Sequence, residues 1–180
     1  METEMSRLQL VKRSLYAMRN GVVADTLRKA GCPHRIVFGL NLPQIADIAR
    51  EFGPDNELAD TLWADTALRE SVLLAPMLYE REDYPEDKSR QMCSQLMWHE
   101  DADILCFKLL RYQPYAPQLA EWLCTADSPL MRYAGLRLYF NIVAQHPAEA
   151  LAAAEAELRR PQPLALANML AEEARFLMEE

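Results

Sequence analysis

Apolar side chains recur at helical spacing along almost the whole chain. Between Met5 and Met18 they fall three or four residues apart, as they do on one face of an α-helix. The same spacing, interrupted by short polar or proline-containing segments, predicts about eleven helices, over residues 4–18, 22–30, 42–52, 57–64, 67–81, 86–98, 100–112, 116–125, 129–145, 148–160 and 163–178. Helices this short are not stable alone, so each is expected to pack against a neighbour.

Capping residues mark several of the predicted helix starts. Asn41 is placed to cap helix 42–52, and Asp65 or Thr66 to cap helix 67–81. Ser128-Pro129 and His146-Pro147 place proline in the first turn of the next helix, where its missing N–H costs nothing. Residues 32–41 contain Pro33 and Gly39 and have no helical pattern. Because no partner strand is predicted, we interpret this segment as an extended connector.

A weak internal repeat supports a stacked arrangement. Leu58-Ala-Asp-Thr-Leu62 recurs as Leu119-Ala-Glu-Trp-Leu123, and Arg69-Glu-Ser-Val-Leu73 parallels Arg132-Tyr-Ala-Gly-Leu136. These offsets of about two helix pairs predict an all-α solenoid of HEAT-like or ARM-type repeats, in a single domain over residues 1–180. Chance similarity between leucine- and alanine-rich helices is the alternative.

The charge is uneven along the chain. The net charge is −8, yet residues 1–35 contain seven basic and three acidic residues, which leaves 12 basic and 24 acidic residues in the remainder. The acidic body argues against nucleic acid as a partner, because phosphate contacts normally supply most of that affinity. A basic N-terminal segment softens this argument, although it also fits a solvated helix face.

The remaining composition favours a cytoplasmic protein without metal or membrane attachment. Its four cysteines are far apart, form no CxxC pair and suggest reduced thiols. No apolar stretch approaches the length of a membrane span, and residues 1–20 do not look like a signal peptide. His34, His99 and His146 are isolated, so we predict no metal site. No glycine-rich phosphate loop or GxSxG motif is present.

Residues 39–51 and 57–75 carry a resemblance to a known family. Gly39-Leu-Asn-Leu-Pro-Gln-Ile-Ala-Asp-Ile-Ala-Arg-Glu, Glu57-Leu-Ala-Asp-Thr-Leu-Trp and Arg69-Glu-Ser-Val-Leu-Leu-Ala resemble the AlkD-like DNA alkylation repair family, over roughly residues 35–140. The resemblance implies HEAT-like repeats. It also implies, for an active member, a glycosylase that releases N3- and N7-alkylated purines without a metal or other cofactor.

The resemblance also indicates where such chemistry would lie. Family members place an aromatic residue and a carboxylate close together, and the best match here is Trp98 with Asp101 or Asp103. A carboxylate stabilises the positive charge of the departing base and the sugar, and an aromatic face attracts the cationic base. A carboxylate four positions after Trp98 would share its helix face, but this position is Ala102. Alternatively, Trp98 packs at a helix end, and Glu100, Asp101 and Asp103 form an acidic first turn.

Arg69, Arg132 and Arg137 are the candidates for phosphate contacts on the concave face. Arg69 could equally form an ion pair between repeats. Three functions therefore remain open. The first is an AlkD-like repeat protein that binds a partner on its concave face, either double-stranded DNA or a protein, with little or no catalysis. The second is an active glycosylase for alkylated purines, and the third is a protein-binding scaffold unrelated to DNA.

Overall fold

The computed structural model describes residues 5–179, which form eleven α-helices and one short 3₁₀ turn. Ile36 and Leu68 make an isolated parallel β-bridge. Residues 5–179 contain no β-strand beyond this bridge. The all-helical fold predicted from the sequence is confirmed. Glu2 and Glu4 of the basic segment lie outside the described residues, and Glu4 is also the first residue of predicted helix 4–18. Contacts divide the chain into two units, residues 1–80 and 81–180.

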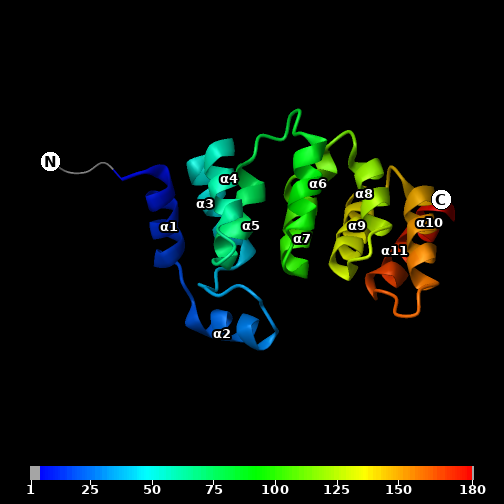
Figure 1. The fold of residues 1–180 in the computed structure, drawn as a ribbon, viewed down its shortest axis with the longest axis horizontal. Coiled ribbons are helices and arrows are strands. Elements are labelled where there is room, and N and C mark those ends of the chain that lie inside the picture. Colours follow the sequence, from blue (N-terminus) through cyan, green and yellow to red (C-terminus); the bar gives the residue numbers. More distant parts are fainter. Residues whose placement is uncertain (1–4, 180) are drawn as a thin grey trace. The chain divides into compact units, whose positions relative to one another are not determined.

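The first unit consists of short helices that pack against one another in pairs. Its helices are α1 (Arg7–Ala17), α2 (Gly21–Lys29), α3 (Leu42–Phe52), α4 (Asn56–Ala64) and α5 (Arg69–Leu78). Helix α5 packs on both α3 and α4, and α1 packs on α3 (Figure 1). Leu62, Leu73, Leu74 and Leu78 are completely buried between them. Burial of these apolar faces supplies the stability that such short helices lack alone.

A buried ion pair holds the connector of residues 32–41 in place. The Glu70 carboxylate accepts hydrogen bonds from the backbone N–H groups of residues 38, 39 and 40, at 3.0, 2.9 and 3.3 Å. Arg69 Nη1 donates to Glu70 Oε1 at 2.7 Å and to the Leu40 carbonyl at 3.1 Å. The connector is non-helical, as predicted, although Gly39 has a left-handed φ of +82°. Two adjacent charged residues of α5 satisfy its backbone groups.

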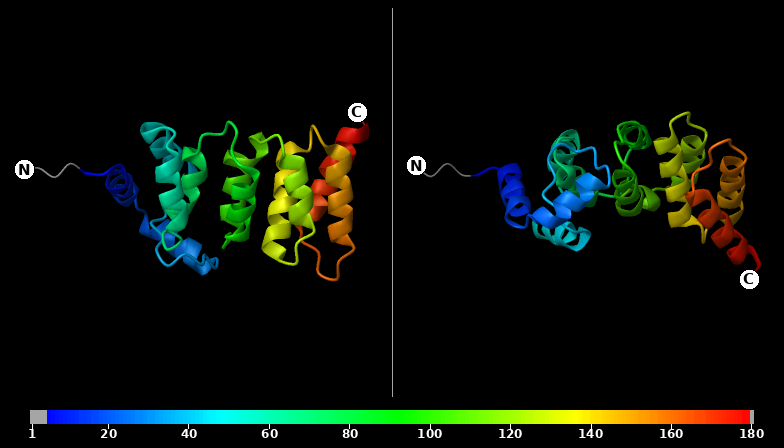
Figure 2. Two further views of the ribbon diagram at one scale, coloured as in Figure 1. Left: turned by 45° about the horizontal axis from the view of Figure 1, so that its top comes forward. Right: turned by 90° about the horizontal axis from the view of Figure 1, so that it is seen from below.

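The second unit consists of successive helix pairs. Its elements are α6 (Glu86–Ser94), α7 (His99–Lys108), η1 (Leu110–Tyr112), α8 (Ala116–Cys124), α9 (Pro129–Ile142), α10 (Pro147–Leu158) and α11 (Leu166–Glu179). Helix α9 contacts α7, α8 and α11, and α10 packs on α11 (Figure 2). Leu105, Leu119 and Leu136 are fully buried in this unit. Pro129 is the first residue of α9, as predicted, and the Ser128 side chain caps this helix.

Several predicted helices begin or end at other residues in the structure; predicted helix 86–98, for example, is α6 and ends at Ser94. Helix 67–81 begins at Arg69 instead, and Leu68, which offers no capping oxygen, stands at its N-cap. Asp65, one of the predicted caps, accepts a hydrogen bond from Ser71 Oγ at 3.0 Å. Helix 100–112 is also shorter than predicted, because α7 ends at Lys108 and the chain tightens into η1. No helix among residues 5–179 is long and apolar enough to cross a membrane.

Candidate nucleic-acid interface

Asp101 and Asp103 lie on the same helix, α7, but in different surroundings. Asp101 is only 1% exposed, and its Oδ2 accepts hydrogen bonds from the backbone N–H groups of Trp98 at 3.0 Å and Met97 at 3.3 Å. Its carboxylate therefore satisfies backbone donors at the start of α7. The acidic first turn predicted as the structural alternative is thus present at Asp101.

Asp103 instead joins an accessible network with α9. Its Oδ1 accepts hydrogen bonds from Arg137 Nε at 2.7 Å and from the Tyr133 hydroxyl at 2.8 Å. Arg137 Nη2 also donates to the Tyr133 oxygen, at 3.0 Å. The side chains of Arg137 and Asp103 are 27% and 36% exposed. We call Asp103, Tyr133 and Arg137 the α7–α9 cluster. The structure thus brings together two residues that sequence reasoning singled out.

Aromatic rings surround this cluster. His99 meets the Tyr133 ring edge-on, with 5.2 Å between centroids, and Trp98 lies 6.5 Å from His99. The Arg137 guanidinium lies 5.6 Å from the Tyr133 ring centroid and 5.8 Å from that of Phe140. Trp98 itself is half-buried at the N-cap of α7. Aromatic faces beside an accessible guanidinium are typical of surfaces that bind nucleic acids.

The electrostatics of the cluster join a protonated tyrosine to an ion pair. Burial raises the pKa of Tyr133, and its hydrogen bond to Asp103 raises the pKa further, while Arg137 partly opposes this. The tyrosine therefore stays protonated and donates to the carboxylate at neutral pH. Asp103 consequently faces one formal positive charge and one hydroxyl donor. The ion pair offsets part of the negative charge of Asp103 and, equally, part of the positive charge of Arg137.

Arg69 and Arg132 do not reach an accessible surface. Arg69 is 3% exposed and belongs to the buried pair with Glu70. Arg132 is 7% exposed; its Nε donates to Glu157 Oε2 at 3.0 Å, and its Nη1 donates to the carbonyls of residues 126 and 127. The two arginines that align in the sequence repeat therefore have similar structural surroundings. Of the three predicted phosphate contacts, only Arg137 lies where a ligand could meet it.

Tyr133 is one of three candidates that the sequence offers for a second aromatic residue of the site, with Trp63 and Trp122, and the structure brings it beside Asp103. Tyr133 lies four residues before Arg137, which places the two on one face of a helix. That spacing is the sequence signal that distinguishes Tyr133 from the two tryptophans, whereas His99, which meets the Tyr133 ring, was not predicted as a site residue. Among residues 5–179 no group of three or more His, Cys, Asp or Glu side chains is arranged to hold a metal ion.

Comparisons with known proteins place the chain in a family. The sequence model of a family described as DNA alkylation repair enzyme matches residues 11–176. The chain belongs to this family. A search of curated proteins finds no match. A solved structure described as "A new family of proteins related to the HEAT-like repeat DNA glycosylases with affinity for branched DNA structures" is similar, with a TM-score of 0.68, 14% identity and 95% coverage of both chains. At this identity the likeness concerns the fold, which is of the HEAT-like repeat type.

Proposed function

We propose that this DNA alkylation repair family member binds DNA through the α7–α9 cluster, with little or no glycosylase activity. Arg137 would contact a backbone phosphate, and the neighbouring aromatic rings would pack against the sugar or base. Family membership supports DNA as the partner. The affinity for branched DNA described for the similar solved structure makes branched DNA the first form to test.

The observation that carries this proposal is the 2.7 Å contact between Arg137 Nε and Asp103 Oδ1. Glycosylase chemistry of this kind needs negative charge where positive charge develops in the transition state. A guanidinium beside the carboxylate places positive charge there instead. Asp101, the other candidate acid, is occupied at the buried start of α7. The same guanidinium, partly exposed, suits contact with a phosphate.

Binding can be measured by fluorescence anisotropy with labelled single strands, duplexes and three-way junctions between about 50 and 300 mM salt. We expect wild-type protein to bind, with affinity falling as salt rises. Arg137→Met should weaken binding and lower the salt dependence by about one phosphate contact. Arg175→Met is the matched control, because Arg175 also forms a partly exposed ion pair, with Glu155. Equal effects of the two substitutions, or no wild-type binding at low salt, would refute the proposal.

The glycosylase remains the second candidate, because the structure gathers an accessible carboxylate and three aromatic or imidazole rings at one place. Release of methylated purine from alkylated duplex DNA tests it directly. We expect wild-type release at the background rate. Release above background that Asp103→Asn or Asp101→Asn abolishes would establish catalysis and overturn the first proposal.

Two further predictions from the sequence belong to this proposal. We propose that residues 1–180 form one HEAT-like repeat domain, which the family match supports because it crosses the boundary between the two units. We also propose a cytoplasmic location, supported by the thiol state of all four cysteines. If DNA binding is absent at low salt, a protein partner becomes the preferred alternative, as the net charge of −8 allows.

A further inference from the structure

A second group of cationic and aromatic side chains lies where α7 ends and η1 begins. The Arg111 guanidinium lies 3.9 Å from the Phe107 ring centroid and 4.7 Å from that of Tyr112. Arg81 lies 4.2 Å from the Tyr112 ring, and Lys108 Nζ lies 5.2 Å from Phe107. Phe107 and Tyr112 are 41% and 45% exposed. We call these five residues the basic–aromatic cluster.

The three cations of this cluster stand apart from the rest of the molecule. Most other arginines of the second unit form ion pairs, including Arg90, Arg132, Arg137 and Arg175. Within residues 5–179, Arg81, Lys108 and Arg111 form none. The hydrogen bond from Arg111, and then the charges of Arg111, Arg81 and Lys108, lower the pKa of the Tyr112 hydroxyl. An acidic protein thus gathers three cations without direct ion pairs at one place, although Glu80, Glu82 and Asp83 flank Arg81 in the sequence.

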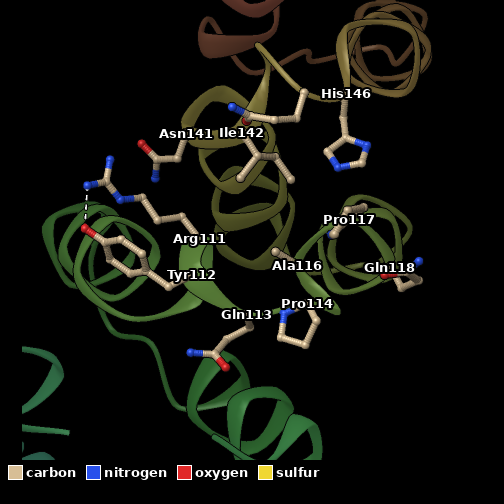
Figure 3. Close-up of a pocket in the computed structure, with 11 residues that line it drawn as sticks. Arg111, Tyr112, Gln113, Pro114, Ala116, Pro117, Gln118, Asn141, Ile142 and His146 are labelled. Atoms are coloured by element: carbon tan, nitrogen blue, oxygen red, sulfur yellow. Dashed lines mark hydrogen bonds between the residues drawn. The ribbon is translucent and has the colours of Figure 1, made fainter. Parts of the chain in front are cut away.

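A cavity of about 520 Å³ opens beside this cluster (Figure 3). Arg111 and Asn141 lie together on one side of it, and Pro117 and His146 lie on the other. Arg111 Nη2 donates to the Tyr112 oxygen at 2.6 Å, which fixes the guanidinium. In the described part of the chain, Arg111 Nε and Asn141 Nδ2 are buried nitrogen atoms without a hydrogen-bond partner. Two buried donors of this kind are costly unless an acceptor joins them.

The α9 helix connects this cavity to the α7–α9 cluster. Tyr133, Arg137 and Asn141 follow one another at intervals of four residues, so they lie along one face of α9. Eight residues of helix span about 12 Å. A DNA strand advances about 3.4 Å per nucleotide along its axis, so this face matches about three or four nucleotides.

We propose that Arg111 and Asn141, with Arg81 and Lys108, form a second phosphate-binding site for the DNA strand that crosses Arg137. The inference rests on the proposed DNA binding and extends it to a named surface. Cation–π contacts hold the guanidinium groups of Arg81 and Arg111 beside aromatic rings, where N–H groups remain to donate to phosphate oxygens.

The double variant Arg81→Met, Lys108→Met tests this site with little risk to folding, because Arg81 is exposed and Lys108 is half-exposed. The logarithm of the affinity for a labelled junction should depend less steeply on the logarithm of salt concentration. Each lost contact should reduce that slope by about 0.7–0.9. Adding Arg111→Met should reduce the slope again by a similar amount. Circular dichroism checks that the variants remain folded.

The double variant Arg159→Met, Arg175→Met removes the same charge from residues outside both clusters and serves as the control. A slope reduced in the cluster variants but not in the control supports the second site. Wild-type binding with equal slopes in all variants overturns the second site and leaves the Arg137 contact standing. No wild-type binding to any DNA at low salt overturns the proposed function, and this inference falls with it.

Discussion

The Arg69–Glu70 pair of the first unit and the Arg137–Asp103 pair of the second unit share the same chemistry and the same 2.7 Å separation. Their side chains differ in exposure: 3% and 0% in the first pair, and 27% and 36% in the second. The donors and acceptors of the buried pair form hydrogen bonds with the connector backbone. The open pair keeps an accessible edge, so only it can exchange its partner for a ligand.

A single helix shows the same contrast. Arg132 and Arg137 are five residues apart on α9, which turns them about 140° from each other. Arg132 points to the buried Glu157, while Arg137 points to the half-exposed Asp103. Residue type therefore does not decide whether an arginine is structural. The face of the helix decides it, because burial determines whether water or a ligand can reach the guanidinium.

The largest expected effect is on the buried pair. Glu70→Ala should lower the free energy of unfolding by about 3–5 kcal/mol, because it leaves Arg69 buried without its carboxylate and frees three connector N–H groups. Glu86→Ala is the control, since it breaks the partly exposed pair with Arg90 and should cost less than about 1 kcal/mol. Chemical denaturation measures both. Similar losses would show that burial does not distinguish these pairs.

Adding a side chain to the connector that the buried pair holds should also destabilise the protein. Gly39 has φ +82°, and a Cβ there would lie 2.2 Å from the Asn20 carbonyl oxygen and 2.6 Å from the Ala24 nitrogen. Gly39→Ala should therefore cost about 2–4 kcal/mol, from backbone strain and a clash with backbone atoms. Gly53 has φ +68°, but a Cβ there would have no other atom within 4 Å. Gly53→Ala should therefore lower the free energy of unfolding only through backbone strain, by about 1–2 kcal/mol. Equal losses of unfolding free energy would contradict the clash.

High pH should lower the stability of the second unit through its buried thiols, with little effect on the open Arg137–Asp103 pair. Burial raises the pKa of Cys93 to about 12 and raises that of Cys106 well above its ordinary value. Unfolded thiols lose their proton near pH 8.5, so the unfolded state binds fewer protons above that pH and stability falls as pH rises. We expect a loss of about 1.4 kcal/mol per thiol by pH 9.5.

Burial raises the pKa of Cys124 to about 12 as well, so three thiols contribute to the loss. Denaturation at pH 7.5 and pH 9.5 measures this loss, and Cys93→Ala should reduce it by about a third. The contribution of Arg137 to DNA binding should change little over the same range, because the raised pKa of Tyr133 keeps its hydroxyl protonated. A stability independent of pH, or an equal loss in Cys93→Ala, would contradict the burial of this thiol as the cause.

The smallest expected effect concerns the open pair itself. Asp103→Asn removes the charge that competes with phosphate for Arg137, so DNA affinity should rise about two- to fivefold, the equivalent of a partly exposed ion pair. Unfolding free energy should change by less than about 1 kcal/mol. Anisotropy titration and denaturation measure the two quantities. A fall in affinity would show that the carboxylate itself contacts the ligand.

Much of the fold could be predicted from the sequence because helices are local. Apolar spacing, the Asn41 cap and the proline that begins helix α9 are signals within a few residues of sequence, and the structure confirms the cap and the proline. The ends of helices 67–81 and 100–112 were less predictable, since Leu68 carries no capping signal and the change to η1 follows no residue type. The family resemblance, carried by spaced residues over about half of the chain, is confirmed by the match over residues 11–176.

The sequence by itself determined the helices, the repeat family and a short list of candidate residues. Only the tertiary structure decided what each candidate can do. It buried Asp101 at a helix start, placed Arg69 and Arg132 against internal carboxylates, and joined Asp103 to Arg137 across two helices. The reason is physical: helical periodicity follows from local backbone geometry, whereas exposure and charge pairing depend on which distant helix faces each side chain.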